Sequence, residues 1–465
     1  MTAPARPERP FFAGSNALVV GAARSGIAAA KLLRRHGAHV RVVDRRASGE
    51  LAAAVRELEP LGVELRLGEN DTAALEGRDL VIPSPGVPLD LPLLREAERR
   101  GIAVAAELEL GHAVAKAPIV AVTGTNGKST TVELLGAIGR AAGRATEVLG
   151  NIGVALSERA EEVPAEGLLV VEVSSFQLES CTRFRPRVGV LLNVTPDHLD
   201  RHGDMKRYMA IKTRLFERQG ETDVRVQPLG DAAIAAALRP MRSRPLWFGF
   251  ADPTGDGVWL DDGVLRWRFA GKQGALARRD EIPLPGPHNT ENMAAAAAAA
   301  LAVGVAPGPI AKALRDFKGL PHRLTLVATI DGVRYVNDSK ATNVDSMRRA
   351  LESFEAPVVL IAGGRDKDGD FAAVTPLVLE RVRHLVTLGE AAEKIERTWF
   401  QVPTTRAATL ETAVAAARSH ATPGGVVLLS PGCASYDMFR NFEDRGARFE
   451  AAVHALERER AGAGR

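Results

Sequence analysis

At residues 118–130 the chain reads Pro118-Ile119-Val120-Ala121-Val122-Thr123-Gly124-Thr125-Asn126-Gly127-Lys128-Ser129-Thr130. A short β-branched run enters a glycine-rich turn, and a helical pattern follows from Ser129 towards Gly143. In a strand, loop and helix of this kind, the backbone N–H groups near the glycines point at phosphate oxygens. Lys128 can reach the β- and γ-phosphates, and the Ser129 hydroxyl can ligate Mg²⁺. The stretch therefore predicts a loop that holds ATP.

This loop departs from the common phosphate-loop pattern G-x-x-x-x-G-K-[ST] at one position. Val122 stands where the first glycine is expected. The alternative is an ordinary strand-to-helix turn with a surface lysine. The order of strand, glycines, lysine and hydroxyl favours nucleotide binding.

Composition restricts the class of protein. The chain has 465 residues, 46% hydrophobic and 25% charged, which is typical of a globular protein with two to four domains, and we expect three. A net charge of +3 with dispersed Lys and Arg argues against nucleic acid as a partner. The two cysteines, Cys181 and Cys433, form no C-x-x-C pattern and fit a reducing cytoplasm. The chain contains no apolar run of about 20 residues, so we expect no membrane span.

The first segment alternates strand and helix patterns. Strands are expected at 17–20, 40–43 and 80–82 with a helix at 26–36, which indicates a parallel sheet with crossover helices. The turn at 21–26 resembles G-x-G-x-x-G, but Ala23 replaces the middle glycine that admits a pyrophosphate. NAD is therefore disfavoured, while a nucleotide ribose or base near Asp44 remains open. Both this turn and the one at 84–87 could instead be tight packing turns.

The second segment begins near Glu107 and contains the ATP loop. Its expected strands at 168–173 and 188–194 carry Glu172 and His198 at or just beyond their carboxyl ends. In a parallel sheet these ends share one edge with the loop, so both side chains could reach a metal beside the phosphates. Either residue alone could also be a satisfied polar group at a strand end. The alanine-rich run at 294–300 predicts a buried, closely packed helix.

The third segment starts near Gly319 and places polar strings after its expected strands, at 337–340, 363–367 and 430–432. This is again a Rossmann-like pattern. The sequence thus predicts an α/β fold with three domains: a Rossmann-like N-terminal domain (1–106), a central P-loop-type mononucleotide-binding sheet (107–319) and a Rossmann-like C-terminal domain (320–465).

Five strings together resemble the Mur ligases over nearly the whole chain: 123–130, Gly150-Asn151-Ile152-Gly153, Glu172-Val173-Ser174-Ser175-Phe176-Gln177-Leu178-Glu179, the run 193–200, and Leu320-Pro321-His322-Arg323. The runs 337–343, 430–435 and 441–443 look like the members that add D-glutamate. The resemblance implies that ATP activates the carboxylate of UDP-N-acetylmuramoyl-L-alanine as an acyl phosphate, which the amine of D-glutamate attacks. It also implies a cytoplasmic monomer that acts on small molecules in peptidoglycan precursor synthesis, with no membrane or nucleic-acid partner.

The resemblance assigns roles residue by residue. Lys128, His198 and Lys212 would be catalytic, and a Lys212 carbamylated by CO₂ would join Ser129, Glu172 and His198 in holding Mg²⁺. A carbamate supplies an anionic oxygen suited to a hard cation, whereas a lysine in a helical stretch is ordinarily solvated. The positions that would bind ATP are Gly124, Thr125, Asn126, Gly127, Lys128, Ser129, Thr130, Asn289, Asn292, Arg323 and Asp338.

The remaining positions would bind the two other substrates. Those implied for the UDP-substrate are Ser25, Asp44, Arg46, Ser84, Gly86, Asn151 and Gln177, and those for glutamate are Thr342, Lys367, Ser435 and the backbone around Phe442. Residues alone leave glutamate stereochemistry open. The competing interpretations are a related Mur ligase with a different amino acid or with L-glutamate, a folate-directed relative, and a non-enzymatic nucleotide sensor.

Overall fold

The computed structural model describes residues 9–355 and 357–463. The chain divides into two compact units. The first contains the residues up to Val194, His202–Ile282 and Glu291–Asp316, and the second contains Thr195–Arg201, Pro283–Thr290 and the residues from Phe317 onward. The division passes through two helices, α8 (Leu199–His202) and α11 (Pro287–Ala302).

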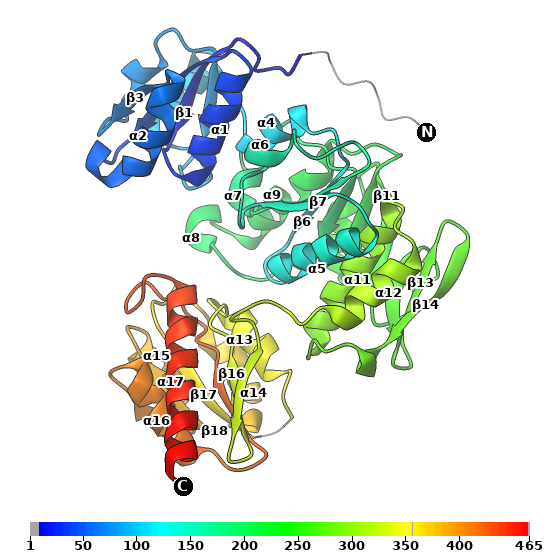
Figure 1. The fold of residues 1–465 in the computed structure, drawn as a ribbon, viewed down its shortest axis with the longest axis vertical. Helices are drawn as coiled ribbons and strands as arrows, with labels where there is room; N and C mark the ends of the chain where they lie inside the picture. The colour runs from blue at the N-terminus through cyan, green and yellow to red at the C-terminus, as the bar shows by residue number, and fades with distance from the viewer. Residues whose placement is uncertain (1–8, 356, 464–465) are drawn as a thin grey trace. The chain divides into compact units, whose positions relative to one another are not determined.

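The first unit begins with a parallel sheet of order β3-β2-β1-β4-β5, drawn in blue in Figure 1. Its strands are β1 (Asn16–Val20), β2 (His39–Asp44), β3 (Glu64–Leu67), β4 (Leu80–Pro83) and β5 (Ala103–Val104). The helices are α1 (Arg24–Arg35), α2 (Ala52–Leu58) and α3 (Pro92–Arg99). Continuous apolar strands such as β1 are buried on both faces, as parallel sheets require.

The same unit holds the central sheet, of order β14-β13-β12-β11-β10-β9-β6-β8-β7. Its strands are β6 (Ile119–Thr123), β7 (Thr146–Gly150), β8 (Leu168–Glu172), β9 (Val188–Leu191), β10 (Val224–Pro228), β11 (Arg244–Gly249), β12 (Gly257–Asp261), β13 (Val264–Phe269) and β14 (Lys272–Arg278). Strand β13 pairs antiparallel with both β12 and β14, and every other pair of neighbours in this sheet, including β11 with β12, is parallel.

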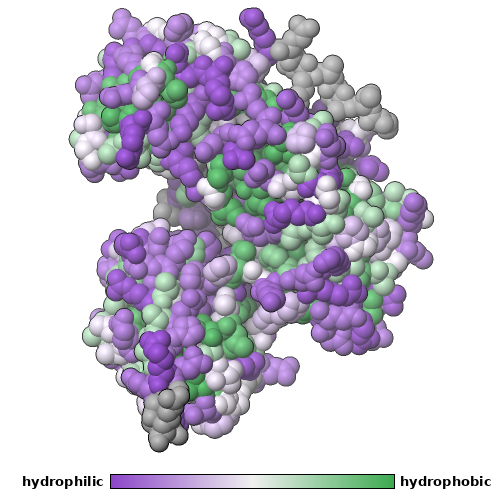
Figure 2. Space-filling view, in the orientation of Figure 1, coloured by the Kyte–Doolittle hydropathy of each residue, from purple (hydrophilic) through white to green (hydrophobic). Residues whose placement is uncertain are grey.

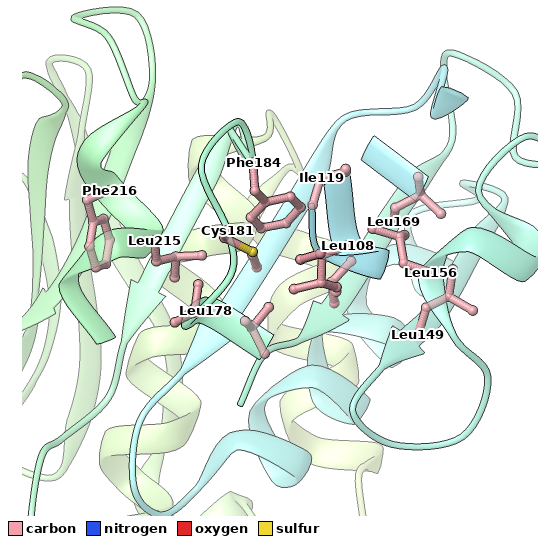
Figure 3. Packing of buried hydrophobic residues seen from close by; sticks show 14 of the residues in the cluster. Leu108, Ile119, Leu149, Leu156, Leu169, Leu178, Cys181, Phe184, Leu215 and Phe216 are labelled. Atoms are coloured by element: carbon pink, nitrogen blue, oxygen red, sulfur yellow. The ribbon is translucent and has the colours of Figure 1, made fainter. Parts of the chain in front are cut away.

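The helices of this central region are α4 (Glu107–Val114), α5 (Lys128–Ala141), α6 (Leu156–Arg159), α7 (Ser175–Leu178), α9 (Met205–Glu217), α10 (Ala232–Leu238), α12 (Pro307–Asp316) and most of α11. An apolar core lies between the sheet and its helices, where Leu178 of α7 and Leu215 of α9 pack with Cys181 and Phe184 (Figure 3). Residues 294–300 of α11 are at most 1% exposed, so the predicted buried alanine helix is confirmed.

The second unit contains a sheet of order β15-β16-β20-β17-β18-β19. Its strands are β15 (Thr325–Ile330), β16 (Val333–Asn337), β17 (Val358–Gly363), β18 (Val382–Leu388), β19 (Thr404–Arg406) and β20 (Val426–Leu429), and only β15 is antiparallel to its neighbour. The helices are α13 (Val344–Leu351), α14 (Thr375–Arg381), α15 (Ala392–Thr398), α16 (Leu410–His420) and α17 (Phe442–Ala463).

Three sheets with flanking helices confirm the predicted three-domain α/β fold. The boundaries after 106 and after 319 stay predictions. Two strands were predicted too long. β8 ends at Glu172 instead of residue 173, and β9 ends at Leu191 instead of residue 194, because the chain beyond β9 turns to bond the ATP loop through Asn193. Hydrophilic side chains cover much of the face shown in Figure 2, with smaller hydrophobic areas between them. Among the described residues, no helix is both long enough and apolar enough to cross a bilayer.

Candidate active site

The ATP loop lies between β6 and α5, where the sequence places it. Helix α5 begins at Lys128, and Gly127 precedes it with φ of 89°, a left-handed conformation that favours glycine. A Cβ atom on Gly127 would lie 2.2 Å from Oδ1 of Asn292. The structure therefore brings Asn292, a predicted ATP residue of α11, against the loop.

Asn193 fixes the shape of this loop. Its carbonyl oxygen accepts from the Thr125 N–H at 3.0 Å, and its Oδ1 accepts from the Asn126 N–H at 2.9 Å. Its amide group also donates to the Asn126 carbonyl at 3.1 Å. Asn193 was not predicted as a site residue; its position just beyond β9, at the sheet edge that holds the loop, was the available signal.

Lys128 and Lys212 converge on one carbonyl oxygen. The Nζ atom of Lys128 donates to the Gly124 oxygen at 2.9 Å and to the Thr125 oxygen at 2.7 Å. Lys212, on α9, donates from its Nζ to the same Gly124 oxygen at 2.8 Å and is 1% exposed. The solvated position typical of a lysine in a helix does not apply here. Two amino groups around one oxygen make this region strongly attractive to anions.

Ser129, in the first turn of α5, lies beside Glu172 at the end of β8. The Ser129 hydroxyl donates to Oε2 of Glu172 at 2.8 Å, and the Asn151 side chain donates to Oε1 at 2.9 Å. Glu172 is 2% exposed, so these donors compensate for its burial. The hydroxyl of Thr130 is buried and has no hydrogen-bond partner among the described residues. A hydroxyl next to a carboxylate is an oxygen donor set of the kind that Mg²⁺ takes.

Of the predicted metal ligands, Ser129, Glu172 and Lys212 belong to the first unit and His198 belongs to the second. His198 has φ of 55°, a left-handed conformation that is uncommon outside glycine, and its N–H donates to Oδ1 of Asp197 at 3.0 Å. In the part of the chain that is described, no three His, Cys, Asp or Glu residues cluster as a metal cage.

A cavity of about 690 Å³ opens at the carboxyl edge of the first sheet. Six of the seven predicted UDP-substrate residues line it: Ser25, Asp44, Arg46, Ser84, Gly86 and Asn151. Gln177 does not line this cavity; its Oε1 accepts from the N–H of Ser174 at the start of α7. The cavity also includes Arg24, which donates to the Asn151 carbonyl at 2.9 Å and so joins the first sheet to the central one.

Asp44 and Arg46 form an ion pair that lines this cavity. Two nitrogen atoms of Arg46 contact the Asp44 carboxylate at 2.8 and 3.1 Å, and the Ala22 N–H donates to it at 2.8 Å. The hydrogen bond from Arg46 lowers the pKa of Asp44 to about 2. The carboxylate therefore stays ionised, as an acceptor for sugar hydroxyls or base N–H groups requires.

The second unit has its own cavity of about 600 Å³, lined by Thr342 and Lys367 together with His198. Two contacts hold the loop that carries His198: the Asn343 amide donates to Asp197 at 3.1 Å, and the Thr195 hydroxyl donates to Asp345 at 3.2 Å.

The other two predicted glutamate residues do not line this cavity. Ser435 is buried, and its carbonyl oxygen accepts from the Phe439 N–H at 2.9 Å. The carbonyl oxygen of Phe442 accepts from the Ser339 hydroxyl at 2.8 Å, and its ring lies against the Lys340 amine.

The remaining predicted ATP residues, Asn289, Arg323 and Asp338, also belong to the second unit. Asp338 accepts from the Ser430 hydroxyl at 2.8 Å, and burial raises its pKa to about 7. The residues on both sides of Arg323, His322 and Leu324, have φ of 61° and 47°. Such values are rare for a bulky side chain and mark local strain at this point of the chain.

Comparison with known proteins identifies the family. Three family models match consecutive parts of the chain: a MurD-like N-terminal domain of Mur ligases at 15–106, the Mur ligase middle domain at 122–300, and the Mur ligase glutamate ligase domain at 322–433. The chain belongs to the Mur ligase family.

Curated relatives of this Mur ligase match almost from end to end. A UDP-N-acetylmuramoylalanine--D-glutamate ligase from Pelotomaculum thermopropionicum is 45% identical, over 96% of this chain and 99% of its own. The protein of the same name from Geobacter metallireducens is 46% identical, with 96% and 98% covered.

Solved structures share the fold of this Mur ligase. A pseudomurein peptide ligase type C from Methanothermus fervidus gives a TM-score of 0.61 at 18% identity, covering 95% of this chain and 100% of that one. A MurF from Acinetobacter baumannii also gives 0.61, at 19% identity, with 93% of each chain covered.

Proposed function

We propose that this Mur ligase joins D-glutamate to UDP-N-acetylmuramoyl-L-alanine at the expense of ATP. It acts on small molecules in peptidoglycan precursor synthesis. The observation that carries the proposal is the near-complete alignment with curated D-glutamate ligases, at 45–46% identity. The contacts around the ATP loop and the two cavities supply a physical account of the reaction.

The reaction has two steps that balance without an oxidant or reductant. The γ-phosphoryl group of ATP is transferred to a carboxylate oxygen of the alanyl end, which gives an acyl phosphate and ADP. The neutral amine of D-glutamate then attacks the acyl carbon, loses a proton, and the C–O bond to phosphate breaks. Phosphoryl transfer of this kind needs positioning and charge neutralisation more than a protein nucleophile.

Lys128 is positioned to neutralise the transferring phosphoryl group. Its amine donates to the Gly124 and Thr125 carbonyls, and polyphosphate oxygens are stronger acceptors than these. Asn292, held against Gly127, is close enough to the loop to contact the nucleotide. Asn289, Arg323 and Asp338 complete the proposed ATP set from the second unit.

Ser129 and Glu172 fit a Mg²⁺ ion, because their oxygens already meet at 2.8 Å in a buried position. When bound there, Mg²⁺ supplies positive charge to the phosphates. Asn151 donates to Glu172 and also lines the cavity proposed for the UDP-substrate, so it orients the carboxylate from the substrate side. His198 and Lys212 are proposed to help hold a second ion near the acyl acceptor.

The shared Gly124 carbonyl gives a reason for Lys212 to be carbamylated. Its neutral amine nitrogen attacks the carbon of CO₂, a C–O π bond breaks to leave a carboxylate, and one proton is released. Counted from the ammonium form, which must first lose another proton to give the neutral amine, the change replaces a positive charge beside Lys128 with a negative one and removes the repulsion between two amines that share the Gly124 carbonyl. It also creates the oxygen ligand that an ammonium lacks.

The proposed substrate sites follow the two cavities. The cavity of about 690 Å³ takes the uridine nucleotide, with the ionised Asp44 as acceptor and Gln177 remaining a predicted contact. The cavity of about 600 Å³ takes D-glutamate, with Lys367 and Thr342 as donors to its carboxylates. Ser435 and Phe442 stay predicted glutamate contacts.

The test is product formation resolved by mass, with ATP, Mg²⁺ and UDP-N-acetylmuramoyl-L-alanine. D-glutamate, L-glutamate and no amino acid are compared in parallel. A product that requires D-glutamate, with equimolar phosphate release, supports the proposal. A product with L-glutamate alone contradicts the stereochemistry, and ATP binding without any product favours a different acceptor.

A further inference from the structure

A chain of contacts between buried polar side chains connects His202 to the ATP loop. The Ser175 hydroxyl lies 3.0 Å from Nε2 of His202, and Oε1 of Glu179 lies 3.1 Å from Nδ1. His202 is 0% exposed and Ser175 is 4% exposed. The hydrogen bond at Nε2 and the carboxylate beside Nδ1 hold the imidazole in position and in rotation.

The flat face of this imidazole supports Tyr208. The two rings stack with centroids 5.1 Å apart and an interplanar angle of 24°. Tyr208 is 1% exposed, and its hydroxyl lies 3.3 Å from the Thr125 hydroxyl of the ATP loop. Tyr208 is thereby confined both by the imidazole and by the loop.

Tyr208 in turn confines Lys212. The Lys212 Nζ lies 4.4 Å from the centroid of the Tyr208 ring while it donates to the Gly124 carbonyl. A ring in this position packs against the amine and limits where it can move. Contacts therefore run without a break from Glu179 through His202 and Tyr208 to the amine of Lys212.

Three helices position this chain: Ser175 is in α7 and Glu179 follows it, His202 ends α8, and Tyr208 and Lys212 are in α9. Helices α7 and α9 pack against each other, and Leu178 of α7 and Leu215 and Phe216 of α9 are buried in one apolar core (Figure 3). Close-packed side chains transmit small displacements. A shift at His202 is consequently expected to reach Lys212 through Tyr208 without unfolding the core.

We propose that His202, oriented by Ser175 and Glu179, is a positioning residue that holds Tyr208 and thereby sets the Lys212 amine for reaction with CO₂. The inference rests on the proposed carbamate at Lys212. A buried histidine that served only the stability of the fold would affect unfolding and not the affinity for CO₂. The two roles therefore separate in one experiment.

The experiment titrates the full chain with ¹³C-labelled bicarbonate and follows the lysine carbamate by ¹³C NMR, with the ligase rate measured at the same bicarbonate concentrations. His202→Ala removes the stacked ring and both nitrogen contacts. We expect the bicarbonate concentration that carbamylates half of Lys212 to be about tenfold higher in this variant than in the wild type. Ser175→Ala removes one contact, and about threefold is expected. His384→Phe is the matched control, because His384 is buried and stacks on His420 in the second unit.

A raised half-saturation in His202→Ala and Ser175→Ala, with His384→Phe unchanged, supports the inference. Unchanged half-saturation in both overturns it, and Ser175→Ala alone decides if His202→Ala does not fold. A wild-type protein with no carbamate signal, the same as Lys212→Ala, overturns the carbamate and this inference together. D-glutamate-dependent product formation then still reports on the proposed ligase reaction separately.

Discussion

Replacing Gly127 by alanine should damage the ATP loop in a way that the structure allows to be quantified. The residue has φ of 89°, and an L-residue in a left-handed conformation costs about 1–2 kcal/mol. The new Cβ would also lie 2.2 Å from Oδ1 of Asn292, whereas ordinary contact begins at 3.4 Å. Moving that buried amide adds about 1 kcal/mol, the size of one typical hydrogen bond. The total is about 2–3 kcal/mol.

This cost should appear mainly as lost nucleotide affinity, because relief of the contact moves either Asn292 or the loop that binds the phosphates. A loss of about 1.4 kcal/mol corresponds to a tenfold rise in Kd, so we expect Kd to increase at least tenfold. Titration calorimetry with Mg²⁺ and a non-hydrolysable ATP analogue measures it directly. UDP binding to the same variant shows whether the first sheet is intact.

Gly143→Ala is the matched control. Gly143 follows α5 with φ of 72°, and nothing lies within 4 Å of its added Cβ. It therefore carries the left-handed strain without the contact. If Gly127→Ala binds the ATP analogue as tightly as Gly143→Ala does, the contact between the loop and Asn292 has no role in nucleotide binding and the reasoning is wrong.

Three further predictions concern single side chains. Lys128→Ala should abolish ADP release while UDP affinity changes less than twofold, and equal loss of both would contradict the separation of the two sites. Lys212→Ala should regain part of its activity with added formate or acetate, which can replace a carbamate oxygen; absence of rescue in folded protein counts against the carbamate. Because the pKa of Asp338 is raised from 3.8 to about 7, the folded chain holds a proton that the unfolded chain has lost. Stability to urea should therefore fall between about pH 4 and pH 7, and Asp338→Asn should flatten that slope; an unchanged slope would place the titrating group elsewhere.

Local sequence patterns predicted the residues whose positions depend on short-range structure. The ATP loop and the strand end at Glu172 follow from chain order and the parallel sheet, and the structure joins them through Ser129. Six of the seven residues that the family resemblance implies for the UDP-substrate line one cavity. Gln177 did not follow the pattern, because its amide group caps the start of α7.

Long-range packing determined what the sequence could not reveal. Nothing in the pattern around Lys212 distinguishes it from a solvated helical lysine, since its burial depends on Tyr208 and on the Gly124 carbonyl of a distant segment. The sequence pattern did not predict a role for His202 either, because its partners Ser175 and Glu179 lie in and just after α7, more than 20 residues earlier in the chain. These residues are recognisable only when α7, the end of α8 and α9 are packed together.

The meeting of two amines at the Gly124 carbonyl also bears on inhibitor design. Lys128 donates to the Gly124 and Thr125 carbonyls of the loop, so a ligand that binds this amine must compete with those hydrogen bonds. A small rigid dianion that accepts from both amines would meet that requirement without an adenine ring. Such a compound would compete with the triphosphate and with the carbamate at once, and loss of either amine should reduce its potency.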